Sequence, residues 1–104
     1  MSLDFSIKKI KMVEVYSGNY THNVIPMWTK AGIYDDLYNS QGKKVKDIIL
    51  NLKKGLIKMK RNPNKYLKLN PKNGWGEYYT AMEFLEEIIK NCEENLNGKI
   101  EISK

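Results

Sequence analysis

The chain has 104 residues, a length that fits one domain because single hydrophobic cores typically form in chains of about 100 to 150 residues. Its 41% hydrophobic and 11% aromatic shares exclude a disordered chain, which would be poorer in both. The net charge of +6 is compatible with an anionic partner, and no apolar run approaches the roughly 18 residues that a membrane span needs. We therefore expect one cytoplasmic domain over residues 1–104, without a signal segment or a membrane partner.

The first predicted elements are β-strands, because apolar and polar residues alternate along the opening segment. The apolar residues change phase within it, as Leu3, Phe5 and Ile7 are followed by Ile10 and Met12. The slip occurs near Lys8, which indicates either a hairpin or a bulge. The strand signal continues to Tyr16, and the Ser-Gly-Asn run at residues 17–19 is expected to end it.

A helix is predicted to follow, with Asn23 as its N-cap. This start places Pro26 in the first turn, where the missing N–H would have no partner within the helix in any case. Gly32 is expected to end the helix, because glycine readily adopts the left-handed conformation found after a helix. The apolar residues from Ile33 to Tyr38 are interpreted as a short connector.

Residues 43–61 carry the clearest helical pattern. Their apolar side chains fall on one stripe, at helical spacing: Val45, Ile48, Ile49, Leu52, Leu56 and Met59. Gly55 costs such a helix up to about 1 kcal/mol relative to alanine, so it is expected to mark a close approach by a neighbouring element. Lysines occupy most other positions, either as a solvated face or as an anion-binding surface.

The rest of the chain predicts a short helix, a loop, a long helix and a closing strand. Asn62 and Pro63 are expected to start the short helix, and residues 69–74 form a turn-rich loop. The long helix has one apolar stripe, comprising Tyr78, Ala81, Met82, Leu85, Ile88, Ile89 and Cys92. Its other face is rich in glutamate, so we expect partial charge neutralisation against the lysines of residues 43–61. Ile100 and Ile102 alternate with polar residues in the closing strand.

These elements predict an α+β fold, in which a small antiparallel sheet packs against three helices. The sheet would contain the N-terminal strand or hairpin together with the C-terminal strand. Because such a sheet has exposed edges, homo-oligomerisation through strands or helices is an open alternative to a monomer.

The inventory of reactive side chains argues against catalysis. One histidine and one cysteine on different elements are too few for a zinc site, and there is no glycine-rich phosphate loop. Cys92 is interpreted as a small buried hydrophobe. We therefore expect no cofactor, no metal site and no catalytic residue. The alternative is a small enzyme that uses His22 with Asp35 or Asp36.

Two polar and aromatic clusters form the candidate ligand site. The first comprises Asn19, Tyr20, Thr21, His22 and Asn23, and the second comprises Asn73, Gly74, Trp75, Gly76, Tyr78 and Tyr79. Both lie at a predicted helix start, where free backbone N–H groups can meet an anion and aromatic rings can stack on a planar group. In the competing interpretation, the asparagines cap, the glycines form turns, Trp75 fills the core and His22 makes local hydrogen bonds.

Nucleic-acid binding through the basic face of residues 43–61 is a further alternative. The residues that would carry it are Lys43, Lys44, Lys46, Lys53, Lys54, Lys58 and Arg61. Clustered cations gain free energy by releasing counterions from phosphates. Against this, Arg61 is the single arginine among 18 basic residues, and arginine is the side chain that grips guanine and phosphate with two hydrogen bonds.

Three short motifs also carry a resemblance: Thr-His-Asn at residues 21–23, Ala-Gly-Ile-Tyr at 31–34 and Asn-Gly-Trp-Gly at 73–76. With the tyrosine that follows and the C-terminal strand, they resemble a group of small proteins encoded by phages and prophages of low-GC bacteria. Pro26 departs from that pattern. The resemblance implies an accessory phage protein with no established reaction, of a kind that often blocks a host protein or sequesters a signalling nucleotide.

We therefore expect a non-catalytic binding protein, with counter-defence as a candidate role. Its partner would be a small anionic or nucleotide-like ligand or a host protein, held by the two clusters.

Overall fold

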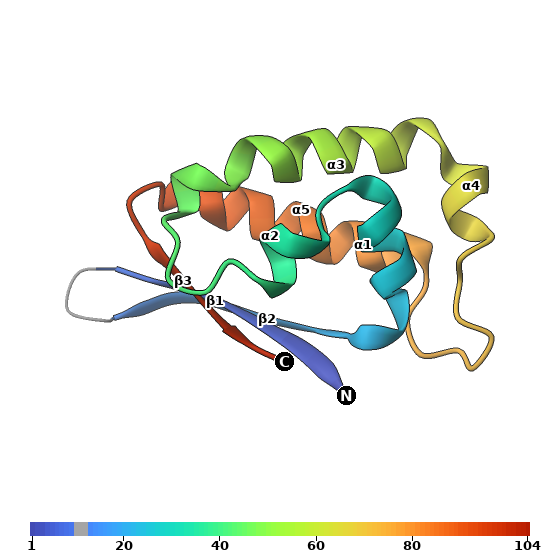
Figure 1. The fold of residues 1–104 in the computed structure, drawn as a ribbon, viewed down its shortest axis with the longest axis horizontal. Coiled ribbons are helices and arrows are strands. Elements are labelled where there is room, and N and C mark those ends of the chain that lie inside the picture. The colour runs from blue at the N-terminus through green and yellow to red at the C-terminus, as the bar shows by residue number, and fades with distance from the viewer. Residues whose placement is uncertain (10–12) are drawn as a thin grey trace.

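Helices cover one face of a small sheet in the computed structural model, which describes residues 1–9 and 13–104 (Figure 1). In chain order the elements are β1 (Ser2–Lys8), β2 (Glu14–Thr21), the 3-10 turn η2 (His22–Val24), α1 (Ile25–Ala31), α2 (Tyr34–Tyr38), the 3-10 turn η3 (Val45–Asp47), α3 (Ile49–Arg61), α4 (Pro63–Leu67), α5 (Tyr78–Glu94) and β3 (Lys99–Ser103). The predicted α+β class is confirmed.

The sheet has three antiparallel strands in the order β2-β1-β3. The opening segment forms a hairpin, one of the two predicted alternatives, and β3 joins the sheet by pairing with the other edge of β1. The register of β1 and β2 shifts between Ile7 and Lys8, where the phase slip indicated a hairpin or bulge. The alternating residues Ile10 and Met12 lie outside the described residues.

Strand β2 runs through residues 17–19 to Thr21, so the prediction that this run ends the strand is wrong. Gly18 lies opposite Phe5 in the sheet. A Cβ atom at Gly18 would collide with the hydroxyl of Tyr16, whose ring lies over this position. Glycine is needed here to make room for an aromatic ring, which outweighs its weak preference for strands.

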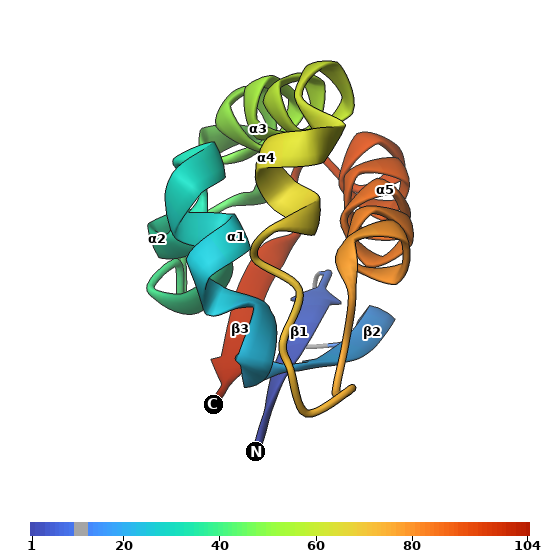
Figure 2. The ribbon, with the colours of Figure 1, turned by 90° about the vertical axis from the view of Figure 1, so that its right-hand side faces the viewer.

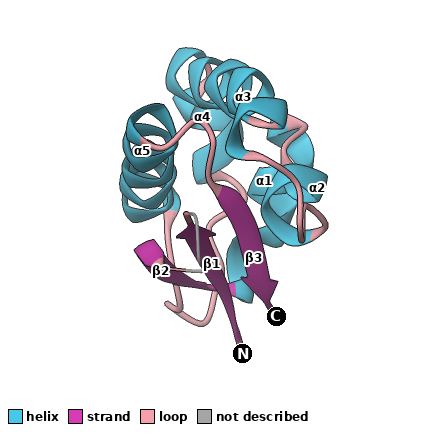
Figure 3. Cartoon of the chain, turned by 90° about the vertical axis from the view of Figure 1, so that its left-hand side faces the viewer, coloured by secondary structure: helices cyan, strands magenta, loops and turns pink. Residues whose placement is uncertain are grey.

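Two groups of helices sit side by side above the sheet, and a third helix covers both. Figure 2 shows α5 on one side and the α1–α2 pair on the other, with α3 above them. The view from the opposite end shows that all the helices lie on one face of the strands (Figure 3). The residues of β1 that point toward the helices are fully buried: Leu3, Phe5 and Ile7. The core therefore lies between the sheet and the helices.

The close approach predicted at Gly55 is confirmed. A Cβ atom there would collide with Cγ2 of Ile33, in the link between α1 and α2. The stripe from Val45 to Met59 faces the core, although it begins with η3 rather than with a continuous helix. Two ion pairs join α3 to α5, Lys53 to Glu93 at 3.0 Å and Lys60 to Glu86 at 3.5 Å. The predicted charge neutralisation between these helices is thus present.

The start of the first helix differs from the prediction. Thr21, not Asn23, is the capping residue: its Oγ1 accepts from the N–H of Asn23 at 3.2 Å and so begins the turn η2. This happens because β2 delivers Thr21 in an extended conformation directly to the turn. Pro26 does fall in the first turn of α1, and Gly32 ends that helix with φ of 78°, both as predicted.

Residues 33–38 were expected to form a connector, but residues 34–38 form the short helix α2. Asp35 and Asp36 lie in its first turn, where carboxylates interact favourably with the partial positive charge of the exposed N–H groups. Leu37 and Tyr38 are buried on its inner side. Within the described part of the chain, no helix is both long and apolar enough to cross a membrane.

Candidate functional site

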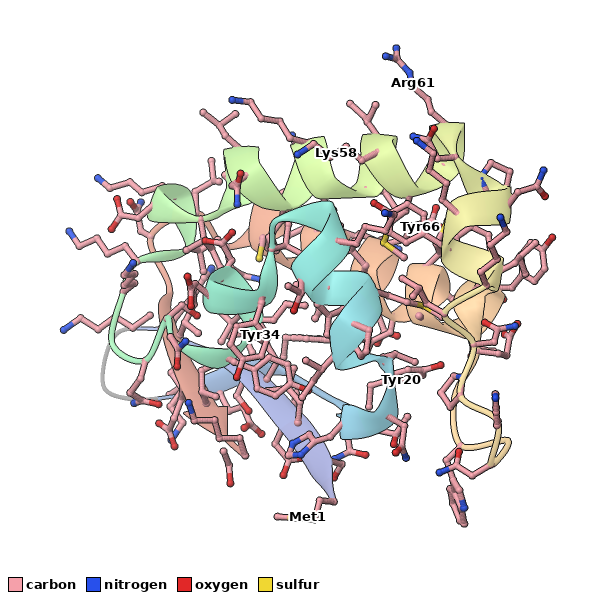
Figure 4. All side chains as sticks on the ribbon, turned by 45° about the vertical axis from the view of Figure 1, so that its right-hand side comes forward. Met1, Tyr20, Tyr34, Lys58, Arg61 and Tyr66 are labelled. Atoms are coloured by element: carbon pink, nitrogen blue, oxygen red, sulfur yellow. The ribbon has the colours of Figure 1, made fainter. Side chains whose placement is uncertain are left out.

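The two predicted clusters meet where β2 ends and α5 begins. The hydroxyl of Tyr20 accepts from the N–H of Glu77 at 3.1 Å and lies 2.5 Å from Oγ1 of Thr80. Figure 4 shows Tyr20 reaching from the end of β2 toward the segment that leads into α5. Two stretches more than 50 residues apart in the sequence are therefore joined at one point.

Gly76 makes this junction possible. It has φ of 90°, and a Cβ atom there would lie 2.6 Å from Cγ2 of Thr21 and 3.1 Å from Cγ1 of Val24. A residue with a side chain would be strained by the backbone angle and blocked by the neighbouring strand. The glycine thus lets the loop lie directly against the end of β2.

An open recess of about 710 Å³ lies between these segments. Its lining is Met1, Ser2, Asn19, Tyr20, Thr21, Asn23, Trp75, Gly76 and Thr80. All of these side chains are neutral, and most are polar. The recess therefore offers hydrogen-bonding groups and two aromatic residues, Tyr20 and Trp75, and none of its lining side chains is charged.

The backbone N–H groups at the start of α5 are already paired, so the prediction that they are free to meet an anion is wrong. The carboxylate of Glu77 accepts from the N–H groups of Tyr79 at 3.1 Å and Thr80 at 2.6 Å. Asn70 Oδ1 accepts from the N–H of Tyr78 at 2.8 Å. Burial acts to raise the pKa of Glu77, but the hydrogen bonds from Thr80 and Tyr79 outweigh it and lower the pKa. The helix end already holds its own anion.

Two asparagine side chains in the recess are held in place by their neighbours. The Nδ2 of Asn19 donates to Ser2 Oγ at 2.8 Å and to Asp4 Oδ1 at 2.6 Å. The Nδ2 of Asn23 donates to Thr21 Oγ1 at 2.9 Å. Because these contacts engage the amide nitrogens, the oxygens of the two amides are left as acceptors for N–H or O–H donors.

Trp75 does not fill the core, as one interpretation of the sequence held, because its side chain is 69% exposed. The tryptophan of the core is Trp28, which is fully buried. Trp75 instead sits on a turn in which Gly74 and Gly76 both have positive φ and Asn73 Oδ1 accepts from the N–H of Trp75 at 2.9 Å. Trp75 is one of the residues that line the recess.

Of the nine residues predicted for the site, five line the recess: Asn19, Tyr20, Thr21, Asn23 and Trp75. The other four do not. Asn73 holds the turn, Tyr79 is exposed elsewhere on α5, and Tyr78 is buried and donates from its hydroxyl to the carbonyl of Met59 at 2.5 Å. His22 is half-buried, with its ring centre 5.4 Å from that of Tyr38.

The sequence reasoning missed Ser2, Thr80 and the capping role of Glu77. A signal for two of them was present, because Glu77 immediately precedes the apolar stripe of the long helix and Thr80 follows it at the spacing of one turn. Ser2 had no local signal, since only the pairing of β1 with β2 brings it beside Asn19.

The basic face proposed for nucleic acid is interrupted. Lys53 is paired with Glu93, and the exposed aliphatic side chains of Leu50 and Ile57 lie among the cations of α3. Lys44 belongs to a bridge with Lys99 at the edge of the sheet, on a different segment from Arg61, which projects from the far end of α3 (Figure 4). The seven residues therefore do not share one uninterrupted surface.

The residues of the enzyme alternative are also placed by the structure. Asp35 Oδ1 accepts from Nδ2 of Asn39 at 2.7 Å, and Asp36 accepts from the side chain of Asn51. Burial raises the pKa of Cys92 to about 12, so this buried thiol stays protonated, in agreement with its interpretation as a hydrophobe. Among the described residues, no group of three histidine, cysteine or acidic side chains is arranged to hold a metal ion.

Comparison of the chain with protein-family models, with curated protein sequences and with solved structures gave no match. The interpretation of the site therefore rests on its own geometry.

Proposed function

We propose that the chain is a non-catalytic binding protein that holds a flat, uncharged polar group, such as a nucleobase, in the recess between β2 and residues 75–80. The observation that carries this proposal is the convergence of five predicted residues on one recess that has an exposed tryptophan and no charged side chain.

The chemistry of the recess suits a planar ligand. Stacking of a base on an aromatic side chain contributes about 1–3 kcal/mol, and it needs a ring face that is free of other contacts. Trp75 supplies such a face. The oxygens of Asn19 and Asn23 can accept from the amino or imino groups at the edge of a base. The volume of about 710 Å³ is in the range of small-molecule sites.

The same lining argues for the base rather than the phosphate of a nucleotide. No cationic side chain lines the recess, and the N–H groups at the start of α5 are occupied by Glu77 and Asn70. A phosphate placed there would lose water without gaining a cationic side chain, since the amino terminus of Met1 is the one cationic group of the lining residues. Of the two ligand classes expected from the sequence, small anions and nucleotide-like molecules, we therefore favour the second. We propose that the recess contacts its uncharged planar base.

Fluorescence titration tests this proposal, because the two tryptophans differ so strongly in exposure. Trp28 is fully buried and reports the fold, whereas Trp75 reports the recess. We expect nucleosides to quench the emission of Trp75, and we expect each 5′-monophosphate to bind no more tightly than its nucleoside. Trp75→Ala lacks the reporting indole, so its binding and that of its control are compared by isothermal titration calorimetry. Trp75→Ala should abolish binding while it leaves the thermal unfolding temperature nearly unchanged.

Tyr79→Ala is the matched control, because Tyr79 is another exposed aromatic residue close in sequence but outside the recess. It should bind like the wild type. The proposal fails if no nucleoside binds at concentrations up to about 1 mM, which corresponds to about −4 kcal/mol, or if Trp75→Ala binds as well as Tyr79→Ala.

A protein that binds a ligand without converting it can act by sequestering that ligand, and this is the biological role that we propose. A protein of the phage accessory kind that holds a nucleotide-like ligand would act by sequestration, which lowers the free concentration of that ligand in proportion to the amount of protein. Counter-defence remains the setting in which we propose this activity.

A further inference from the structure

The outer edge of β3 is covered by the protein itself. The N–H of Ile100 donates to the carbonyl of Lys43 at 2.9 Å, and its carbonyl accepts from the N–H of Gly42 at 2.8 Å. The N–H of Ile102 donates to Oε1 of Gln41 at 2.6 Å. Residues 41–43 thus pair with three of the backbone groups that β3 turns away from β1: the N–H and C=O of Ile100 and the N–H of Ile102.

The outer edge of β2 has no such cover. Hydrogen bonds alternate along an antiparallel pair, and the N–H of His22 donates to the carbonyl of Met1 at 3.2 Å. This sets the phase: Tyr20 and Gly18 exchange hydrogen bonds with β1, while Ser17, Asn19 and Thr21 turn their N–H and C=O groups outward. In the described part of the chain, no hydrogen bond from another segment reaches these outward groups.

Nothing in the sequence of this edge blocks the addition of a strand. Proteins usually protect an exposed edge with lysine, proline or a bulge. Residues 16–21 contain neither a lysine nor a proline, and the extra residue of the register shift, Val15, lies just before them on β2. The side chains of Ser17, Asn19 and Thr21 are small and neutral.

The middle of the edge also contains an unsatisfied polar group. The side chain of Tyr16 is only 8% exposed, and its hydroxyl has no hydrogen-bond partner among the described residues. This hydroxyl lies where a side chain at position 18 would otherwise be. Because this hydroxyl is buried between the sheet and Phe84 of α5, a segment added at the edge would contact the backbone of β2 and not the hydroxyl itself.

The helix beside this edge is acidic. Phe84 of α5 stacks on Tyr20 of β2 with ring centres 5.3 Å apart, and Glu87 follows Phe84 by three residues on the same side of α5. Glu83 and Glu94 lie one turn before and two turns after Glu87 on the same side of α5. No ion pair engages these three carboxylates within the described residues, and Lys90 is the single basic residue of α5.

We propose that the open edge of β2 binds an extended, lysine- or arginine-rich segment of another protein as a fourth strand. The backbone of that segment would pair with Ser17 and Asn19, and its basic side chains would meet Glu87 and Glu83. Addition of a strand draws its affinity from main-chain hydrogen bonds, and the flanking charges select the partner.

A second copy of the chain fits this edge poorly. Antiparallel pairing of two β2 strands would place both helical layers on the same side of one continuous sheet. The acidic sides of the two α5 helices would then face each other across the junction, and like charges in that position oppose association. The charge of the edge therefore favours a basic partner over self-association.

Hydrogen exchange with two synthetic peptides tests this inference. One short peptide alternates lysine with valine, and its counterpart has glutamate in place of each lysine. In the free protein, the amides of Ser17 and Asn19 should exchange quickly, while that of Gly18, bonded to β1, is protected. The lysine peptide should slow exchange at Ser17 and Asn19, and the glutamate peptide should have no effect.

Two variants separate the backbone from the charge contribution. Ser17→Pro removes an outward N–H without removing a hydrogen bond to β1, and it should weaken binding by up to about tenfold. Glu87→Lys should weaken it by about three- to tenfold. The control Asp47→Lys makes the same charge reversal on the exposed turn η3 and should bind like the wild type.

The inference is overturned if neither peptide protects Ser17, if both peptides bind equally, or if Glu87→Lys binds as tightly as Asp47→Lys. A stable dimer in size-exclusion chromatography with protected Ser17 would also overturn it, because the edge would then be occupied by a second copy. Nucleoside binding read from Trp75 is a separate measurement, so failure of one proposal leaves the other standing.

Discussion

One edge of the sheet is covered by a loop and the other is open, although apolar and polar residues alternate in both edge strands. At β3, residues 41–43 return from α2 and bond to the outward groups of Ile100 and Ile102. At β2, the outward groups of Ser17 and Asn19 are left without partners from the described part of the chain, and the strand ends at the recess beside Trp75. The path of a loop, rather than the composition of a strand, therefore decides which edge is available for binding.

The two edge strands should differ most in how much their side chains contribute to the free energy of unfolding. Ile100 is 1% exposed on the covered edge, so Ile100→Ala should lower the free energy of unfolding by about 2–5 kcal/mol through lost burial and a residual cavity. Urea denaturation measures this change. Val15→Ala, at the exposed start of the open strand, should stay within about 0.5 kcal/mol of the wild type. Equal costs at the two positions would mean that the edges are energetically alike.

The junction at the end of the open edge depends on Glu77. Glu77→Gln should lower the free energy of unfolding by about 0.5–2 kcal/mol, the usual range for loss of a helix N-cap, because a neutral amide accepts less strongly from Tyr79 and Thr80. The pKa of Glu77 is lowered in the folded protein. Its contribution is therefore fully present above the pKa of the unfolded chain, and it is lost as the pH falls through the folded value.

Urea denaturation of the wild type and Glu77→Gln between about pH 7 and about pH 2.5 checks this dependence. The difference between the two proteins should narrow as the pH falls. Glu83→Gln, on the same helix but without an amide to bind among the described residues, should show little difference at any pH. A gap for Glu77→Gln that stays constant with pH would show that the ionised carboxylate does not stabilise this helix end.

The smallest expected change in the free energy of unfolding is at Gln41, whose side chain accepts a hydrogen bond from the edge of β3. Gln41→Ala removes the acceptor for the N–H of Ile102 and should cost about 0.5–1.5 kcal/mol, with faster hydrogen exchange at the amide of Ile102. Ser17→Ala on the open edge removes only a 3.3 Å hydrogen bond with Ser6 and should change exchange at Asn19 very little. If Ile102 stays protected in Gln41→Ala, the cover of β3 does not depend on this side chain.

Local patterns were enough to predict most of the elements. The apolar stripe from Val45 to Met59 indicated a core-facing helix, and Gly55 correctly marked a close approach. Gly18 misled in the opposite way, since the same residue type was taken as the end of β2 when it makes room for the ring of Tyr16. The role of a glycine depends on what faces it, and the facing group can be anywhere in the chain.

In the candidate site, too, local sequence predicted which residues take part but not which distant residues they contact. Residues 19–23 and 73–79 were recognisable as polar and aromatic clusters, and the expectation that they belong together is supported by the recess they share. The details of their chemistry were not accessible in this way. Whether the N–H groups at the start of α5 are free depends on Glu77 and Asn70. Trp75 is exposed, while the buried tryptophan is Trp28, and the two residues have the same local signal in the sequence.

The amino-acid sequence alone determined the α+β class, the order of the main elements and the membership of the two clusters, because periodicity and turn chemistry act between residues close in the chain. The tertiary structure decided which hydrogen-bonding groups have partners: Gln41 reaches Ile102, Tyr20 meets Glu77, and Ser17 has no such partner in the described residues. These pairings depend on the paths of loops between distant segments. A buried or edge-bound N–H must find an acceptor wherever the fold happens to bring one, and local sequence does not carry that information.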